Sequence, residues 1–123
     1  MAAGDVRIGC ASWALPPAVQ HEFPAGDSRL ARFAQVKRHA QEKVLSQLSQ
    51  LDAHLASQDG PWFLGADYTA LDAYVFTLCR WTRNFSHGRA RELPRLGPYL
   101  QRMLARPAVQ RMLANEALQP PFV

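Results

Sequence analysis

The chain has few cysteines and no long apolar run. Its two cysteines, Cys10 and Cys79, are 69 positions apart and form no CxxC pair. We therefore predict no disulfide framework and no thiol redox motif, and a reducing, cytoplasmic setting fits best. No apolar run approaches the roughly 20 residues that cross a bilayer, so we predict no membrane span. Residues 8–19 could pass for a short signal-peptide core, but Asp5 weakens the charged flank and no clean cleavage pattern follows.

Several motifs that mark reactive sites are also missing. The seven glycines are scattered and no GxSxG elbow occurs, which disfavours a phosphate loop and a serine hydrolase. His39 and His54 lie 15 positions apart on one predicted helix, which is about 22 Å by helix rise and too far for one ion. His21 and His87 have no neighbouring carboxylate pair at ligand spacing. We predict no metal site.

The charge of the chain is unevenly distributed. Residues 1–61 carry six basic and six acidic side chains, whereas residues 62–123 carry eight arginines against four acids. Between positions 80 and 111 the only acid among the eight arginines is Glu92. Such an excess could attract an anionic ligand or nucleic acid. The arginines are spread over several elements without interleaved aromatics, so a solvated basic face is favoured and a nucleic-acid partner is not expected.

Strand patterns are absent, and the chain is predicted to be all-α. Its 123 residues, 48% of them hydrophobic, suit one compact domain over residues 1–123. Pro16 and Pro17 break the first helical segment, residues 5–23, near Leu15. Further helices are predicted from Asp27 and Ser28 to about Gln58, over residues 70–81, from Pro94 to Ala105, and from Pro107 to about Leu118.

Two of these helices have informative patterns. Val44, Leu48, Leu51 and Leu55 step by 4, 3 and 4 and predict one buried stripe; a coiled coil is the alternative. Residues 62–65 are an apolar loop that should pack on the core, and Val109, Met112 and Leu113 should share one face of the last helix.

The helix over residues 70–81 begins with a capping box. The Thr69 hydroxyl can accept from the amide of Asp72, and the Asp72 carboxylate can reach back to the amide of Thr69. The helix is apolar almost all round, which is typical of the middle of a domain, so Cys79 is expected to be buried rather than nucleophilic.

The order of these features resembles the C-terminal helical domain of cytosolic glutathione transferases, closest to the bacterial beta-like class. The likeness covers roughly residues 10–119. Its most specific parts are the segments Gly65-x-x-x-Thr69-x-x-Asp72-Ala73-Tyr74 and Gln101-Arg102-Met103-x-x-Arg106-Pro107-x-Val109. The resemblance implies a right-handed bundle of about five helices.

The resemblance also implies a site. His21 looks like the counterpart of a helix-borne histidine close to glutathione, although Val19 and Pro16-Pro17 depart from the family pattern. Trp13, Arg80 and Trp81 resemble residues that face the cleft for a hydrophobic electrophile. No cofactor is implied, because glutathione is a cosubstrate. The implied reaction joins glutathione to the electrophile, as in detoxification.

In that family a thioredoxin-like domain stabilises the glutathione thiolate, which is the nucleophile. This sequence lacks the alternating strands of that domain, as if the chain were truncated or encoded without its partner. We therefore expect the chain alone to carry no catalytic residue and to be nearly silent. Trp13 and Leu15 would then lose their cover, and the exposed apolar patch should drive homodimer formation or capture a separate thioredoxin-like domain.

Two other interpretations stay open. The same fold serves as a non-catalytic assembly module on translation factors and some tRNA synthetases, and an arginine-rich second half would suit that role. An independent helical ligand-binding protein is the third possibility. The pair His21 and Trp81 distinguishes the enzyme from the assembly module, because the enzyme needs both residues and the assembly module does not.

Overall fold

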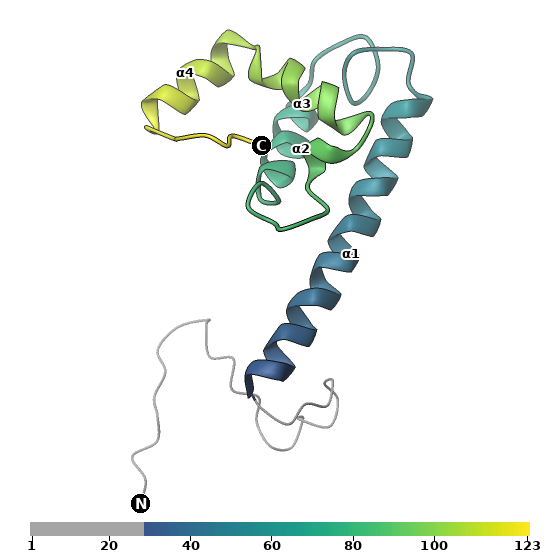
Figure 1. Cartoon of the computed structure of the whole chain (residues 1–123). Coiled ribbons are helices and arrows are strands. Elements are labelled where there is room, and N and C mark those ends of the chain that lie inside the picture. The colour runs from purple at the N-terminus through teal and green to yellow at the C-terminus, as the bar shows by residue number, and fades with distance from the viewer. Residues whose placement is uncertain (1–28) are drawn as a thin grey trace, which may run out of the picture. The chain divides into compact units, whose positions relative to one another are not determined.

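The computed structural model describes residues 29–123, and that part of the chain is helical. The helices are α1 (Arg29–Ser57), α2 (Ala70–Arg80), the short 3-10 helix η2 (Ala90–Glu92), α3 (Leu96–Leu104) and α4 (Pro107–Asn115) (Figure 1). Over these residues no strand forms beyond one isolated bridge between Trp62 and Gly65. The predicted all-α class is confirmed. Four α-helices are described instead of five, because the first predicted segment, residues 5–23, lies outside the described residues.

The chain divides into two compact units, Met1–Gln41 and Glu42–Val123. Helix α1 runs from one into the other. In the first unit the described part is the beginning of α1, where Leu30 is exposed. The second unit contains the rest of α1, the other helices and the whole described core. The single domain over residues 1–123 stays a prediction.

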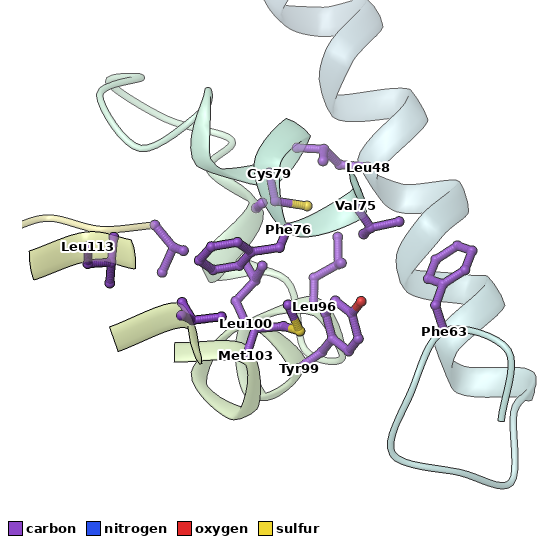
Figure 2. Close-up of a cluster of buried hydrophobic side chains, with 13 residues drawn as sticks. Leu48, Phe63, Val75, Phe76, Cys79, Leu96, Tyr99, Leu100, Met103 and Leu113 are labelled. Carbon is purple, nitrogen blue, oxygen red and sulfur yellow. The ribbon is translucent and has the colours of Figure 1, made fainter. Parts of the chain in front are cut away.

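The core of the second unit is built from one side of each helix. Leu48 of α1 is buried, and Val44, Leu51 and Leu55 pack against the core, so the predicted stripe is confirmed. Helix α3 contributes the most deeply buried side chains, and α2 and α4 add theirs around them (Figure 2). The buried members are Leu48, Phe63, Val75, Phe76, Cys79, Ala90, Leu96, Tyr99, Leu100, Met103, Val109, Leu113 and Val123.

Some predicted details are wrong. In the apolar loop, Phe63 is buried but Leu64 is 60% exposed. Met112 is also exposed, because Val109 and Leu113 alone face the core from α4. Helix α3 begins at Leu96, two residues after Pro94, and the segment between α2 and α3 forms η2, which the sequence did not predict.

A tight turn brings the apolar loop to the core. The backbone N–H groups of Trp62 and Gly65 each donate to the carbonyl of the other, at 3.0 and 3.1 Å. Gly65 has φ +119°, and a Cβ on Gly60 would lie 2.1 Å from the carbonyl carbon of Gly65. Both positions therefore need glycine. The turn directs Phe63 inward while Leu64 remains in solvent.

Candidate functional site

The structure describes two of the four predicted site residues. His21 and Trp13 lie outside the described residues. Arg80 is the last residue of α2 and Trp81 is its C-cap. The side chain of Trp81 is 67% exposed, whereas the Arg80 guanidinium is partly buried and its Nε donates to the backbone oxygen of Phe122 at 2.8 Å. Trp81 is thus open to a ligand, and Arg80 already has a protein partner.

Trp81 does not stand alone on α2. Tyr74, seven positions earlier, is 61% exposed. Residues seven apart lie on the same side of an α-helix. Helix α2 therefore presents an aromatic side to solvent, although its apolar sequence predicted burial all round. Within the second unit, Tyr74 and Trp81 are the two large aromatic side chains of α2 that remain open to solvent.

The other end of α2 is fixed by a buried carboxylate. Asp72 is fully buried, and its Oδ2 accepts from the amide of Thr69 at 2.8 Å. The predicted capping box is confirmed, and the Thr69 hydroxyl also accepts from the amide of Leu71 at 3.3 Å. Asp72 Oδ1 accepts from the amide of Phe63 at 2.9 Å and from the hydroxyl of Tyr99 at 2.7 Å. One carboxylate thus joins the apolar loop, α2 and α3.

The protonation states follow from these contacts. Burial acts to raise the pKa of Asp72, but the hydrogen bonds from the Thr69 and Phe63 amides and the Tyr99 hydroxyl outweigh it, so the pKa lies below its usual value. Burial and the neighbouring Asp72 raise the pKa of Tyr99. Asp72 therefore stays ionised and Tyr99 stays a donor at neutral pH. Nothing in the local sequence pattern marks Tyr99 as this partner.

Most arginines of residues 62–123 make contacts with other parts of the same chain. Six of the eight between positions 80 and 111 hydrogen-bond to backbone oxygens or stack on aromatic rings. The arginines that donate to backbone oxygens hold turns and chain segments together. The sequence pattern predicted a solvated basic face and did not predict this role. The six are Arg80, Arg83, Arg89, Arg91, Arg102 and Arg106.

Arg106 completes an aromatic stack. Its guanidinium carbon lies 3.6 Å from the ring centre of Tyr68 and 5.2 Å from that of Trp62. The two rings meet edge to face at 5.2 Å, and Nε of Arg106 is buried without a hydrogen-bond partner. The cation thus joins the apolar loop to the turn between α3 and α4 through ring contacts.

Three further findings concern the Cys79 thiol, metal binding and membrane spans. Cys79 is fully buried, as predicted, and burial raises the pKa of its thiol to about 12. Within residues 29–123, no three His, Cys, Asp or Glu side chains are grouped so that they could hold a metal ion. None of the helices over the same residues combines the length and apolarity needed to cross a membrane.

Comparison with known protein families places these features in one family. The family described as "Glutathione S-transferase, C-terminal domain" matches residues 17–102, more than two thirds of the chain. The match includes the capping box, Tyr99 and the arginine-rich segment through Arg102. The chain therefore belongs to the family of glutathione S-transferase C-terminal domains. Comparisons with curated proteins and with solved structures gave no match. The beta-like class stays a prediction.

Proposed function

We propose that the chain supplies the helical domain of a glutathione transferase-like enzyme, which conjugates glutathione to hydrophobic electrophiles once a thioredoxin-like domain is joined to it. Membership of the family is the observation that carries this proposal. The residues support separate roles for the two domains. No residue of this sequence is a candidate for stabilising the thiolate, whereas Trp81 is a large apolar side chain that is open to an electrophile. In this proposal the enzyme is a cytoplasmic homodimer that acts in detoxification.

Trp81 is the residue that we assign to the electrophile. Arg80 was predicted to line the same cleft, but its Nε is hydrogen-bonded to Phe122. Trp13 and His21 are proposed to contact the electrophile and glutathione, respectively, on the strength of the resemblance alone. A role for Trp81 in binding, without a part in the chemistry, predicts a change in KM for the electrophile while KM for glutathione stays constant.

The test compares the chain alone with the chain fused behind a thioredoxin-like domain of the same family. Conjugation of glutathione to 1-chloro-2,4-dinitrobenzene should be undetectable for the chain and measurable for the fusion. In the fusion, Trp81→Ala should raise KM for the electrophile about tenfold, the size expected for a lost apolar contact. His21→Ala should raise KM for glutathione instead.

Tyr74→Ala is the matched control, since Tyr74 is an equally exposed aromatic on the same side of α2. It should leave both KM values unchanged. A folded fusion that does not conjugate glutathione would refute the proposed enzymatic function. Equal effects of Trp81→Ala and Tyr74→Ala on KM for the electrophile would refute the assignment of Trp81 to electrophile binding.

A non-catalytic assembly module is the second candidate. It is favoured by one observation: Tyr74 and Trp81 together expose an aromatic side of α2, and such surfaces often receive a protein partner. In that case Trp81→Ala and Tyr74→Ala should weaken self-association of the chain to a similar degree, as measured by sedimentation velocity. His21→Ala should have no effect on self-association.

A further inference from the structure

Two arginines lie close to the exposed Trp81 at the end of α2. Arg80 directly precedes Trp81, and its Nε donates to the backbone oxygen of Phe122 at 2.8 Å. Arg83 follows two positions after Trp81, and its Nη1 donates to the backbone oxygen of Arg80 at 2.9 Å. That carbonyl group is bonded to the backbone nitrogen of Trp81. The Arg83 guanidinium therefore folds back on the end of the helix and places a positive charge beside the backbone of Trp81.

The charges of Arg80 and Arg83 are not balanced by a carboxylate. Within residues 29–123, neither guanidinium lies within ion-pair distance of an acidic side chain. Glu92, the one acid between positions 80 and 111, pairs with Arg89 at 2.8 Å. Burial lowers the pKa of Arg80, and the nearby charge of Arg83 lowers it further. The two cations repel each other, and an anion at this end of α2 would reduce that repulsion.

The same end of α2 offers a ring and free hydrogen-bond donors. The side chain of Trp81 is 67% exposed. Arg80 and Arg83 are partly exposed, and each uses one of its donors in the bonds to Phe122 and Arg80. A guanidinium has five N–H donors in a planar fork that matches the oxygens of a carboxylate. A planar ligand with a negative group can therefore contact Trp81 and Arg83 together.

We propose that Arg83 makes the electrophile site selective for aromatic compounds that carry a carboxylate or a sulfonate, with the ring on Trp81 and the anionic group on the Arg83 guanidinium. This inference rests on the proposed role of Trp81 in electrophile binding and adds a substrate class to it. Arg80 contributes its charge while its Nε stays bonded to Phe122. Arg83 selects the ligand and takes no part in the chemical step.

The experiment uses the chain alone and two probes without a leaving group, so that binding is measured without catalysis. The probe 1,3-dinitrobenzene is neutral, and 3,5-dinitrobenzoate is the same ring with a carboxylate. Nuclear magnetic resonance follows the indole N–H of Trp81, which is assigned by its loss in Trp81→Phe. At low salt the benzoate should bind about fivefold more tightly than the neutral probe, and high salt should reduce this preference because it screens exposed charges.

Variants of single arginines test whether Arg83 causes the preference. Arg83→Gln should weaken binding of 3,5-dinitrobenzoate about fivefold and leave binding of 1,3-dinitrobenzene unchanged. Arg83→Lys, which keeps the charge, should retain part of the preference. Arg111→Gln removes an exposed arginine of α4 and is the matched control; it should change neither affinity. Glutathione, which has carboxylates and no aromatic ring, should not shift the Trp81 resonance.

The outcomes separate this inference from the proposed function. Equal affinity for the two probes, equal effects of Arg83→Gln and Arg111→Gln, or a shift of the Trp81 resonance by glutathione would each overturn the selectivity assigned to Arg83 and leave the conjugation reaction untouched. If neither probe shifted the resonance, the role of Trp81 in electrophile binding would be refuted as well. A folded fusion that does not conjugate glutathione would refute the enzymatic function even if both probes bind as expected.

Discussion

The hydroxyl of Tyr99 donates a 2.7 Å hydrogen bond to Oδ1 of Asp72, which lies 27 positions earlier in the chain. Both side chains are fully buried or nearly so. The bond links the beginning of α2 to the middle of α3, and the same oxygen accepts from the amide of Phe63. A carboxylate in this position does more than cap a helix, since three segments depend on it for a hydrogen-bond acceptor.

Asp72→Ala should destabilise the protein strongly. The substitution leaves the Phe63 amide and the Tyr99 hydroxyl buried without an acceptor, and it also removes half of the capping box. We expect a loss of about 3 kcal/mol or more in the free energy of unfolding. Urea unfolding followed by circular dichroism measures it. Asp67→Ala, at an exposed position nearby, should change stability by less than about 0.5 kcal/mol.

Acid should remove the contribution of Asp72. The pKa of this carboxyl is lower in the folded protein than in the unfolded chain, so its stabilising effect is complete above about pH 4 and is lost as the pH falls through the folded-state pKa. Asp72→Asn has no such group. The difference in unfolding free energy between wild type and Asp72→Asn should therefore shrink between about pH 6 and about pH 3. A constant difference over that range would contradict the prediction.

Asp52→Ala should weaken the start of α3. Oδ1 of Asp52, on α1, accepts from the amides of Arg95 and Leu96 at 2.8 and 2.7 Å, and Arg95 itself provides no side-chain cap. Loss of a cap costs about 0.5–2 kcal/mol. Asp52→Asn keeps one acceptor oxygen and should recover part of that loss in thermal unfolding. Asp59→Ala, at an exposed acidic position just after α1, serves as the control.

Arg106→Lys should not preserve the stack on Tyr68 and Trp62. A guanidinium is planar and lies flat on a ring, whereas an ammonium is compact and strongly hydrated. We expect Arg106→Lys to lose about 0.5–2 kcal/mol of stability and Trp62 emission to shift as its surroundings change. Arg111→Lys, on the exposed surface of α4, should be neutral in both measurements.

Cys79 should be inert in the folded protein. Its side chain is fully buried, and burial raises the pKa of the thiol to about 12, so hardly any thiolate exists at neutral pH. In a Cys10→Ser variant, Ellman's reagent should react within seconds after unfolding in guanidinium, and slowly, at a rate limited by opening, without it. Rapid reaction of the native variant would show that Cys79 is accessible.

Local sequence patterns predicted the features that depend on local geometry. The spacing of Val44, Leu48, Leu51 and Leu55 predicted their shared face, and Thr69 with Asp72 predicted the start of α2. Both depend on residues three or four positions apart, which are neighbours on any helix.

The contacts that join separate elements could not be predicted in this way. Tyr99 and Asp72 meet because α2 and α3 pack together, and Asp52 caps α3 because α1 passes that helix end. The exposure of Leu64 and Met112 likewise depends on where the core ends. Of the candidate site, Arg80 and Trp81 are placed, and the roles of His21 and Trp13 stay predictions.

The Asp72 carboxylate accepts hydrogen bonds from the apolar loop, from the start of α2 and from α3. If one of these segments opened alone, a buried charge would lose part of its hydrogen bonding. Their amides should therefore exchange with deuterium as one cooperative block, at a rate close to that of global unfolding. The segment beyond α4 is held through Leu118, Phe122 and Val123 and through the arginine bonds to its backbone, without a bond to Asp72, so we expect it to exchange as a separate and less protected block. One buried carboxylate would then set which segments of the second unit open together, although those segments are far apart in the sequence.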